Sequence, residues 1–168
     1  MTKVRYILLL LLFSLVGIFV QETLLSSILL PYLVPNFLLI IVVFLAYYEA
    51  SAFGACLAFM VGLIYDVSSG VVLGPWAASF VLVFAVFCSL SQRVFLESYL
   101  AAFLAVFLST MLCNGAYIAL VGGFGVETSV MFSVSLIEGV VSGLLAPFVL
   151  KAFKKLLLGK DLTSASAY

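Results

Sequence analysis

The sequence is poor in charge. Only 8% of its 168 residues are charged and 67% are hydrophobic, whereas roughly a quarter of the residues in an average soluble domain are charged. The mean hydropathy is +1.41, and only lipid can solvate so much apolar surface on a chain of this size. We therefore expect residues 1–168 to form a single transmembrane domain rather than a water-soluble protein.

Histidine is absent, and the few charges cancel. Seven Lys and Arg residues balance seven Asp and Glu residues, so no net charge attracts nucleic acid, and nucleic acid is not an expected partner. Without histidine, the chain lacks the usual general base near neutral pH and the commonest ligand of transition metals. We expect no catalytic residues, no metal site and no cofactor.

Paired cysteines are absent as well. Cys56, Cys88 and Cys113 lie singly inside apolar runs, and no CxxC spacing occurs. Isolated cysteines of this kind behave as small hydrophobic residues. The sequence therefore predicts three buried free thiols.

Charged and turn-forming residues divide the apolar sequence into six segments. A helix needs about 20 largely apolar residues to cross a membrane, and the intervals between charges approach that length. The pattern predicts an all-α integral membrane protein with six transmembrane helices in one bundle, near residues 5–21, 36–49, 52–66, 73–91, 97–121 and 129–150. Residues 151–168 are expected to form a short basic and polar cytoplasmic tail.

The basic residues predict the orientation of these spans. Short cytoplasmic loops of membrane proteins carry the excess of Lys and Arg. With six spans, all seven basic residues fall on one side of the membrane: Lys3, Arg5, Arg93, Lys151, Lys154, Lys155 and Lys160. We therefore expect both termini in the cytoplasm and the turn that follows Asp66 on the outer side.

Two acidic residues lie in or at the edge of predicted spans. A charge inside a span costs about 2.5–3.5 kcal/mol on insertion scales, so Asp66 and Glu138 are functional candidates. Asp66 can accept backbone N–H groups as an Asx-turn or a helix cap, or it can shape a site together with Ser69. Glu138 can face the bundle interior beside Ser135 and Ser142, or it can contact a partner.

Small residues recur every four positions in two of the spans. This spacing lets membrane helices approach closely, and it predicts helix packing at Gly54, Ala58, Gly139 and Gly143. Gly62 and Asp66 continue the same spacing along the third span. Asn114 is a polar residue within the fifth span, and we expect it to form hydrogen bonds between helices.

Two short motifs resemble those of the rod shape-determining MreD family. One is a Pro-Asn pair at the start of an apolar helix, and the other is GxxxDxxSGxxLG. The sequence carries both, and the candidates for contact with a partner are Pro35, Asn36, Gly62, Asp66, Ser69, Gly70, Leu73 and Gly74. The length of the chain and its basic C-terminal region also resemble the family.

The resemblance implies a non-enzymatic scaffold subunit of the bacterial cell-elongation (rod) complex, a multi-pass protein of the cytoplasmic (inner) membrane. Members of the family bind the single-span protein MreC, and with it they help to couple the MreB filament to RodA and a class B penicillin-binding transpeptidase. Such a subunit would support lateral peptidoglycan synthesis and cell shape. The resemblance also implies a helical bundle similar to the substrate-binding subunits of energy-coupling-factor transporters.

Two other functions remain open from the sequence. A small solute-binding subunit of a vitamin-type transporter would have an outward pocket near Asp66, Ser69 and Trp76. However, such transporter subunits resemble one another in carrying an Ala-xxx-Ala motif on the first helix, and the first span of this chain lacks it. An intramembrane enzyme would use Asp66 or Glu138 as acid or base, but no histidine, metal cluster or nucleophile motif accompanies them.

Overall fold

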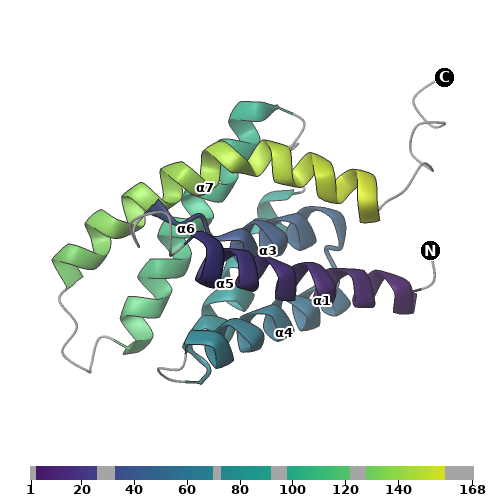
Figure 1. Cartoon of the computed structure of the whole chain (residues 1–168), viewed down its shortest axis with the longest axis horizontal. Helices are drawn as coiled ribbons and strands as arrows, with labels where there is room; N and C mark the ends of the chain where they lie inside the picture. The colour runs from purple at the N-terminus through teal and green to yellow at the C-terminus, as the bar shows by residue number, and fades with distance from the viewer. Residues whose placement is uncertain (1–2, 26–32, 70–72, 92–97, 122–127, 158–168) are drawn as a thin grey trace.

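The computed structural model describes residues 3–25, 33–69, 73–91, 98–121 and 128–157 (Figure 1). These residues form six α-helices and one π-helical turn: α1 (Lys3–Phe19), η1 (Val20–Leu25), α3 (Phe37–Tyr48), α4 (Ala52–Ser69), α5 (Pro75–Ser91), α6 (Tyr99–Val121) and α7 (Thr128–Leu157). The predicted all-helical fold is confirmed. Residue Gly70 of the second motif lies outside the described residues.

The helices differ in whether they can cross a membrane. Three stretches are long and apolar enough to do so: Ala52–Ser69, Tyr99–Val121 and Ser133–Leu156. The other apolar helical stretches are shorter: Ile7–Thr23, Phe37–Tyr48 and Pro75–Ser91. The chain thus has the composition of a multi-pass membrane protein, built from helices of unequal length.

Helix α3 forms the core of the bundle. Every residue from Leu38 to Ala46 is buried, and α3 contacts α1, α4, α5, α6 and α7. Figure 1 shows α3 in the middle of the other helices. A helix that is apolar on all sides belongs in such a position, so the residues of α3 face protein rather than lipid.

The helix in the second predicted span is shorter than the hydrocarbon layer of a membrane is thick. Helix α3 has 12 residues and is therefore about 18 Å long at 1.5 Å per residue, whereas the hydrocarbon layer is about 30 Å thick. The helix begins after Pro35 and Asn36, both of which are buried. The N-terminal end of α3 is therefore enclosed by the other helices.

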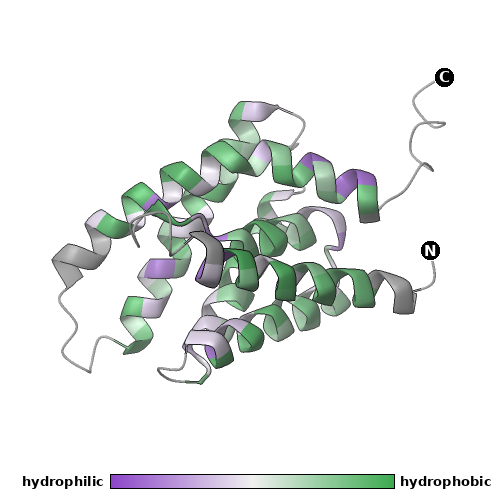
Figure 2. Ribbon diagram, in the orientation of Figure 1, coloured by the Kyte–Doolittle hydropathy of each residue, from purple (hydrophilic) through white to green (hydrophobic). Residues whose placement is uncertain are grey.

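The last helix is longer than the sequence predicts, because α7 continues past residue 150 to Leu157. Phe153 explains the extension: it is 8% exposed, and its ring packs against Phe13 of α1 and Phe44 of α3, with centroid distances of 5.2 and 5.8 Å. The first part of the expected cytoplasmic tail is therefore helical. Figure 2 shows hydrophilic residues gathered toward this C-terminal end of α7.

The start of α1 and the end of α7 lie at the same end of the bundle (Figure 1). This arrangement places the first and the last described residues together, beside the lysines of α7. The number of crossings and the side of the membrane that this end faces stay predictions.

The cysteines are free thiols, but they are not all buried. Cys113 is buried, Cys88 is half-buried and Cys56 is exposed. The expectation of burial is wrong for Cys56, because it lies on an exposed face of α4 together with Phe59 and Met60. Thiols and apolar side chains on such a face are compatible with contact with lipid.

Glycines mark where the helices pack most closely. A Cβ atom on Gly62 of α4 would lie 2.4 Å from the Cα atom of Ala77 in α5, and one on Gly143 of α7 would lie 2.8 Å from the ring of Phe103 in α6. Gly54 likewise lies against Phe84 of α5, and Gly139 lies against Met111 and Phe107 of α6. Ala58 is fully buried. The small residues thus line the two most extensive helix contacts, α4 with α5 and α6 with α7.

We expect Gly62→Ala to lower the free energy of unfolding by about 1–3 kcal/mol, because the added methyl group meets the backbone of α5 and must push the two helices apart. Gly115 is a matched control: it is helical too, but a Cβ atom there would have no neighbour within 4 Å. Gly115→Ala should leave stability unchanged or raise it by up to about 1 kcal/mol. Unfolding of the purified protein in mild detergent measures both, and equal effects would contradict the close approach.

Candidate functional site

Asn36 holds the start of α3. Its side-chain Oδ1 accepts a hydrogen bond from the backbone N–H of Leu39 at 3.1 Å, which makes it the N-cap of the helix. Its Nδ2 donates to Oε1 of Glu138 at 3.2 Å, and its backbone N–H donates to Oγ of Ser142 at 2.9 Å. The position needs an acceptor and a donor on one short side chain, and asparagine supplies both.

Glu138 connects this cap to a third helix. Its second oxygen, Oε2, accepts a hydrogen bond from Nδ2 of Asn114 in α6 at 2.9 Å. The same Nδ2 group donates to Oγ of Ser135 at 3.0 Å. The carboxyl group of Glu138 therefore lies between two amides, one before α3 and one in α6. Hydrogen bonds between membrane helices stabilise a bundle by about 0.6 kcal/mol each, so this network joins α3, α6 and α7.

Asp66 caps the start of α5 through its side chain. The residue is 1% exposed. Its Oδ1 accepts a hydrogen bond from the backbone N–H of Trp76 at 3.1 Å, and its Oδ2 accepts one from Ala77 at 3.0 Å. These N–H groups belong to the first turn of α5 and have no partner within their own helix. The sequence suggested an Asx-turn or a helix cap at Asp66, and both side-chain oxygens cap the first turn of α5.

The rest of the second motif explains how the carboxyl group of Asp66 reaches α5. Gly74 precedes the helix with a φ of +114°, a conformation that favours glycine, and it offers no side chain to cap the helix. Pro75 occupies the first helical position, where its missing N–H does no harm. Gly62, one turn before Asp66, lets α5 approach. We call Gly62, Asp66, Gly74 and Pro75 the α4–α5 joint.

The motif candidates divide into buried and surface residues. Pro35, Asn36, Gly62 and Asp66 are buried, so in this structure they cannot touch a partner. Ser69 and Leu73 are exposed, with Leu73 at 70%, and Gly74 is half-buried. Ser69 donates a hydrogen bond to the backbone oxygen of Asp66 at 3.0 Å. Among the motif residues that the structure describes, Ser69 and Leu73 are therefore the ones exposed enough for another protein to reach.

An aromatic cluster beside the α4–α5 joint was not evident from the sequence. Trp76 stacks on Tyr117 of α6 with a centroid distance of 4.2 Å, and its ring edge meets Tyr65 of α4 at 4.9 Å. The hydroxyl of Tyr65 accepts a hydrogen bond from Nε2 of Gln21 in η1 at 3.3 Å. These side chains come from four separate elements, so no local spacing could have linked them.

The carboxyl groups of Asp66 and Glu138 are engaged in hydrogen bonds within the bundle. In the part of the chain that the structure describes, no three His, Cys, Asp or Glu residues lie together as metal ligands would. Both carboxyl oxygens of Asp66 bind backbone N–H groups, and those of Glu138 bind two amide groups. Each acid is thus engaged in holding the start of a helix.

We expect Asp66→Ala to lower the free energy of unfolding by about 1–3 kcal/mol, because it leaves two buried N–H groups of α5 without an acceptor. Asp66→Asn keeps one acceptor and should cost less. Ser68→Ala is the control, since Ser68 is exposed and only donates to the oxygen of Ile64 in its own helix. Detergent unfolding of the three variants tests the order, and a wild-type value for Asp66→Ala would contradict the cap.

Glu138→Gln should also destabilise the protein by about 1–3 kcal/mol. The new NH2 group must face an amide NH2 of Asn36 or Asn114, so one buried hydrogen bond is lost. Glu49→Gln is the matched control, because Glu49 accepts its side-chain hydrogen bond from Ser51 at an exposed turn, and it should change stability by less than about 0.5 kcal/mol. The same unfolding measurement applies. Additive effects of Asn36→Ala and Glu138→Gln would show that the two residues do not interact.

A comparison with known protein families identifies the family of this chain. The family model of the rod shape-determining protein MreD matches residues 1–156, a range that contains both motifs, the α4–α5 joint and the Asn36–Glu138 network. No curated protein and no solved structure matches, so the expected similarity to energy-coupling-factor subunits stays a prediction. The chain therefore belongs to the MreD family of non-enzymatic, rod shape-determining membrane proteins.

Proposed function

We propose that this chain is a scaffold subunit of the bacterial cell-elongation complex, located in the cytoplasmic (inner) membrane, where it binds an MreC-like single-span protein. Family membership supplies the role in rod shape. The observation that favours a scaffold is that the carboxyl groups of Asp66 and Glu138 form hydrogen bonds within the bundle. What the bundle offers to other proteins is therefore apolar surface.

Through this partner, the subunit would act on the enzymes of wall synthesis. RodA and a class B penicillin-binding transpeptidase would be held in the same assembly, and the MreB filament would be reached indirectly. The subunit would thereby support lateral peptidoglycan synthesis. We also propose that both termini lie in the cytoplasm, because α1 begins and α7 ends at the same end of the bundle, where Lys151, Lys154 and Lys155 lie.

The partner surface that we propose flanks the α4–α5 joint. Val67 and Leu73 are each 70% exposed, and they lie on either side of the turn between α4 and α5. Asp66 holds the end of α4 against the start of α5 through its hydrogen bonds to α5. Two large apolar side chains held beside the contact between α4 and α5 offer a partner a preorganised contact, which lowers the entropy lost on binding. With both termini in the cytoplasm, this surface faces the outer side.

Co-purification of the full chain with its single-span partner from mild detergent tests the proposal. We expect Val67→Ser combined with Leu73→Ser to weaken retention of the partner about tenfold, because two apolar contacts are lost. Leu90→Ser is the matched control: Leu90 is 40% exposed near the other end of α5, and its substitution should leave retention unchanged.

Each other outcome counts against a stated part of the proposal. Wild-type retention by the double variant would mean that the partner docks elsewhere. If the wild-type chain retains no partner at all, the scaffold function is wrong. Tight retention of a vitamin-like solute through purification would favour the transporter subunit instead.

A further inference from the structure

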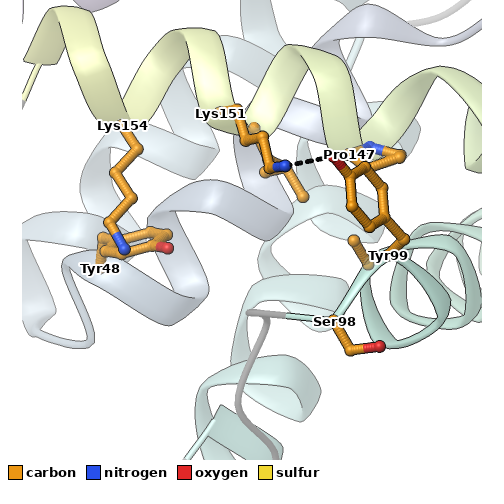
Figure 3. A pocket seen from close by; sticks show the side chains of 8 residues that line it. Tyr48, Ser98, Tyr99, Pro147, Lys151 and Lys154 are labelled. Atoms are coloured by element: carbon orange, nitrogen blue, oxygen red, sulfur yellow. Dashed lines mark hydrogen bonds between the residues drawn. The ribbon is translucent and has the colours of Figure 1, made fainter.

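A pocket of about 230 Å3 lies at the lysine end of α7, between the end of α3 and the start of α6. Its lining residues are Tyr48, Ser98, Tyr99, Ala102, Pro147, Leu150, Lys151 and Lys154. Figure 3 shows Lys151 and Lys154 on one side of α7, directed toward Tyr99 and Tyr48. The hydrogen-bonding networks of Asp66 and Glu138 involve none of these residues, so the pocket is separate from the contacts that hold the helix starts.

Two ammonium groups meet in this pocket without an acid. Residues three apart share a helix face, and Nζ of Lys151 lies 3.9 Å from the ring centre of Tyr99, while Nζ of Lys154 lies 5.7 Å from that of Tyr48. Lys151 also donates a hydrogen bond to the Tyr99 hydroxyl. An ammonium group has three donors, so Lys151 keeps two for a ligand. No carboxyl group lines the pocket in the described part of the chain.

The pocket has both polar and apolar lining residues. Ala102, Pro147 and Leu150 add apolar groups to its lining. Exposed apolar side chains then continue along α6 and α7 toward their middle: Leu100, Leu104, Leu144 and Phe148. A free phosphate ion would use only the polar lining residues. A phospholipid, with a phosphate head and acyl chains, would use both.

We propose that this pocket binds the phosphate headgroup of an anionic phospholipid, with its acyl chains lying along the exposed apolar face of α6 and α7. Basic pockets between transmembrane helices on the cytoplasmic side suit such headgroups. The site belongs to the leaflet that contains the C-terminal end of α7. It is independent of partner binding at the α4–α5 joint, which lies toward the opposite end of the bundle.

The test compares phosphatidylglycerol, which is anionic, with phosphatidylcholine, which is zwitterionic, on the full chain in mild detergent. Native mass spectrometry counts the bound lipids, and the thermal unfolding midpoint reports stabilisation. The wild-type chain should retain phosphatidylglycerol preferentially and unfold at a higher temperature in its presence. Replacing Lys151 and Lys154 by Gln should reduce the preference about fivefold for each lysine.

Two controls make the result specific to the pocket. Lys155→Gln removes the same charge from the next position of α7, which does not line the pocket, and it should keep the preference. Lys151→Arg with Lys154→Arg keeps both charges and should also keep it. Circular dichroism verifies that every variant remains helical.

Three outcomes would overturn the proposal. The wild-type chain could show no preference for phosphatidylglycerol. Lys155→Gln could lose as much preference as the Gln variants at Lys151 and Lys154, in which case general surface charge is responsible. Finally, glycerol 3-phosphate or inorganic phosphate could displace the lipid at equal concentration, and the site would then bind a soluble phosphate rather than a phospholipid.

Discussion

The structure depends on the hydrogen bonds that hold the start of α3. This helix begins among other helices, where its first N–H groups cannot reach bulk water, and an unpaired backbone group in a membrane costs several kcal/mol. Asn36 caps the helix, and Glu138 holds the amide of Asn36 from α7 while it also binds Asn114 of α6. The position of α3 therefore fixes where α6 and α7 must stand. A core helix too short to cross the membrane becomes possible because its end is satisfied inside the protein.

The start of α5 obeys the same rule with a different residue. The first N–H groups of α5 are bonded by Asp66 of α4 rather than by a residue at the helix start, since Gly74 has no side chain to offer. In both places the side chain that satisfies a helix start is held by, or belongs to, another helix. Local capping and helix packing are thus one interaction, and the motif residues Asn36 and Asp66 are buried because they serve it.

The sequence and the structure agree where the signal is local. Glycine and alanine at intervals of four predict close packing, and Gly62 and Gly143 lie against α5 and α6. The hydrogen-bond partners of the polar residues could not be predicted from the sequence. Asn36 and Glu138 are 102 positions apart, and the spacing of residues within one helix does not indicate contacts between such distant positions. Helix α3 has nearly the expected bounds, but its complete burial could not be predicted, because an apolar run looks the same whether lipid or protein surrounds it. The stacking of Trp76 on Tyr117 likewise exists only in the folded bundle.

Charge in this chain is divided between interior and surface. The side chains of Asp66 and Glu138 are bonded to backbone and amide groups within the bundle, so they are not available to neutralise lysines. At the lysine end of α7, Lys151 and Lys154 lie against tyrosine rings, which attract a cation without cancelling its charge. A chain with no net charge therefore presents local positive charge where α7 ends. With the orientation proposed above, the phosphate groups of the bilayer would lie at the level of that end, and they would supply the counter-charge that the described lining residues of the pocket lack.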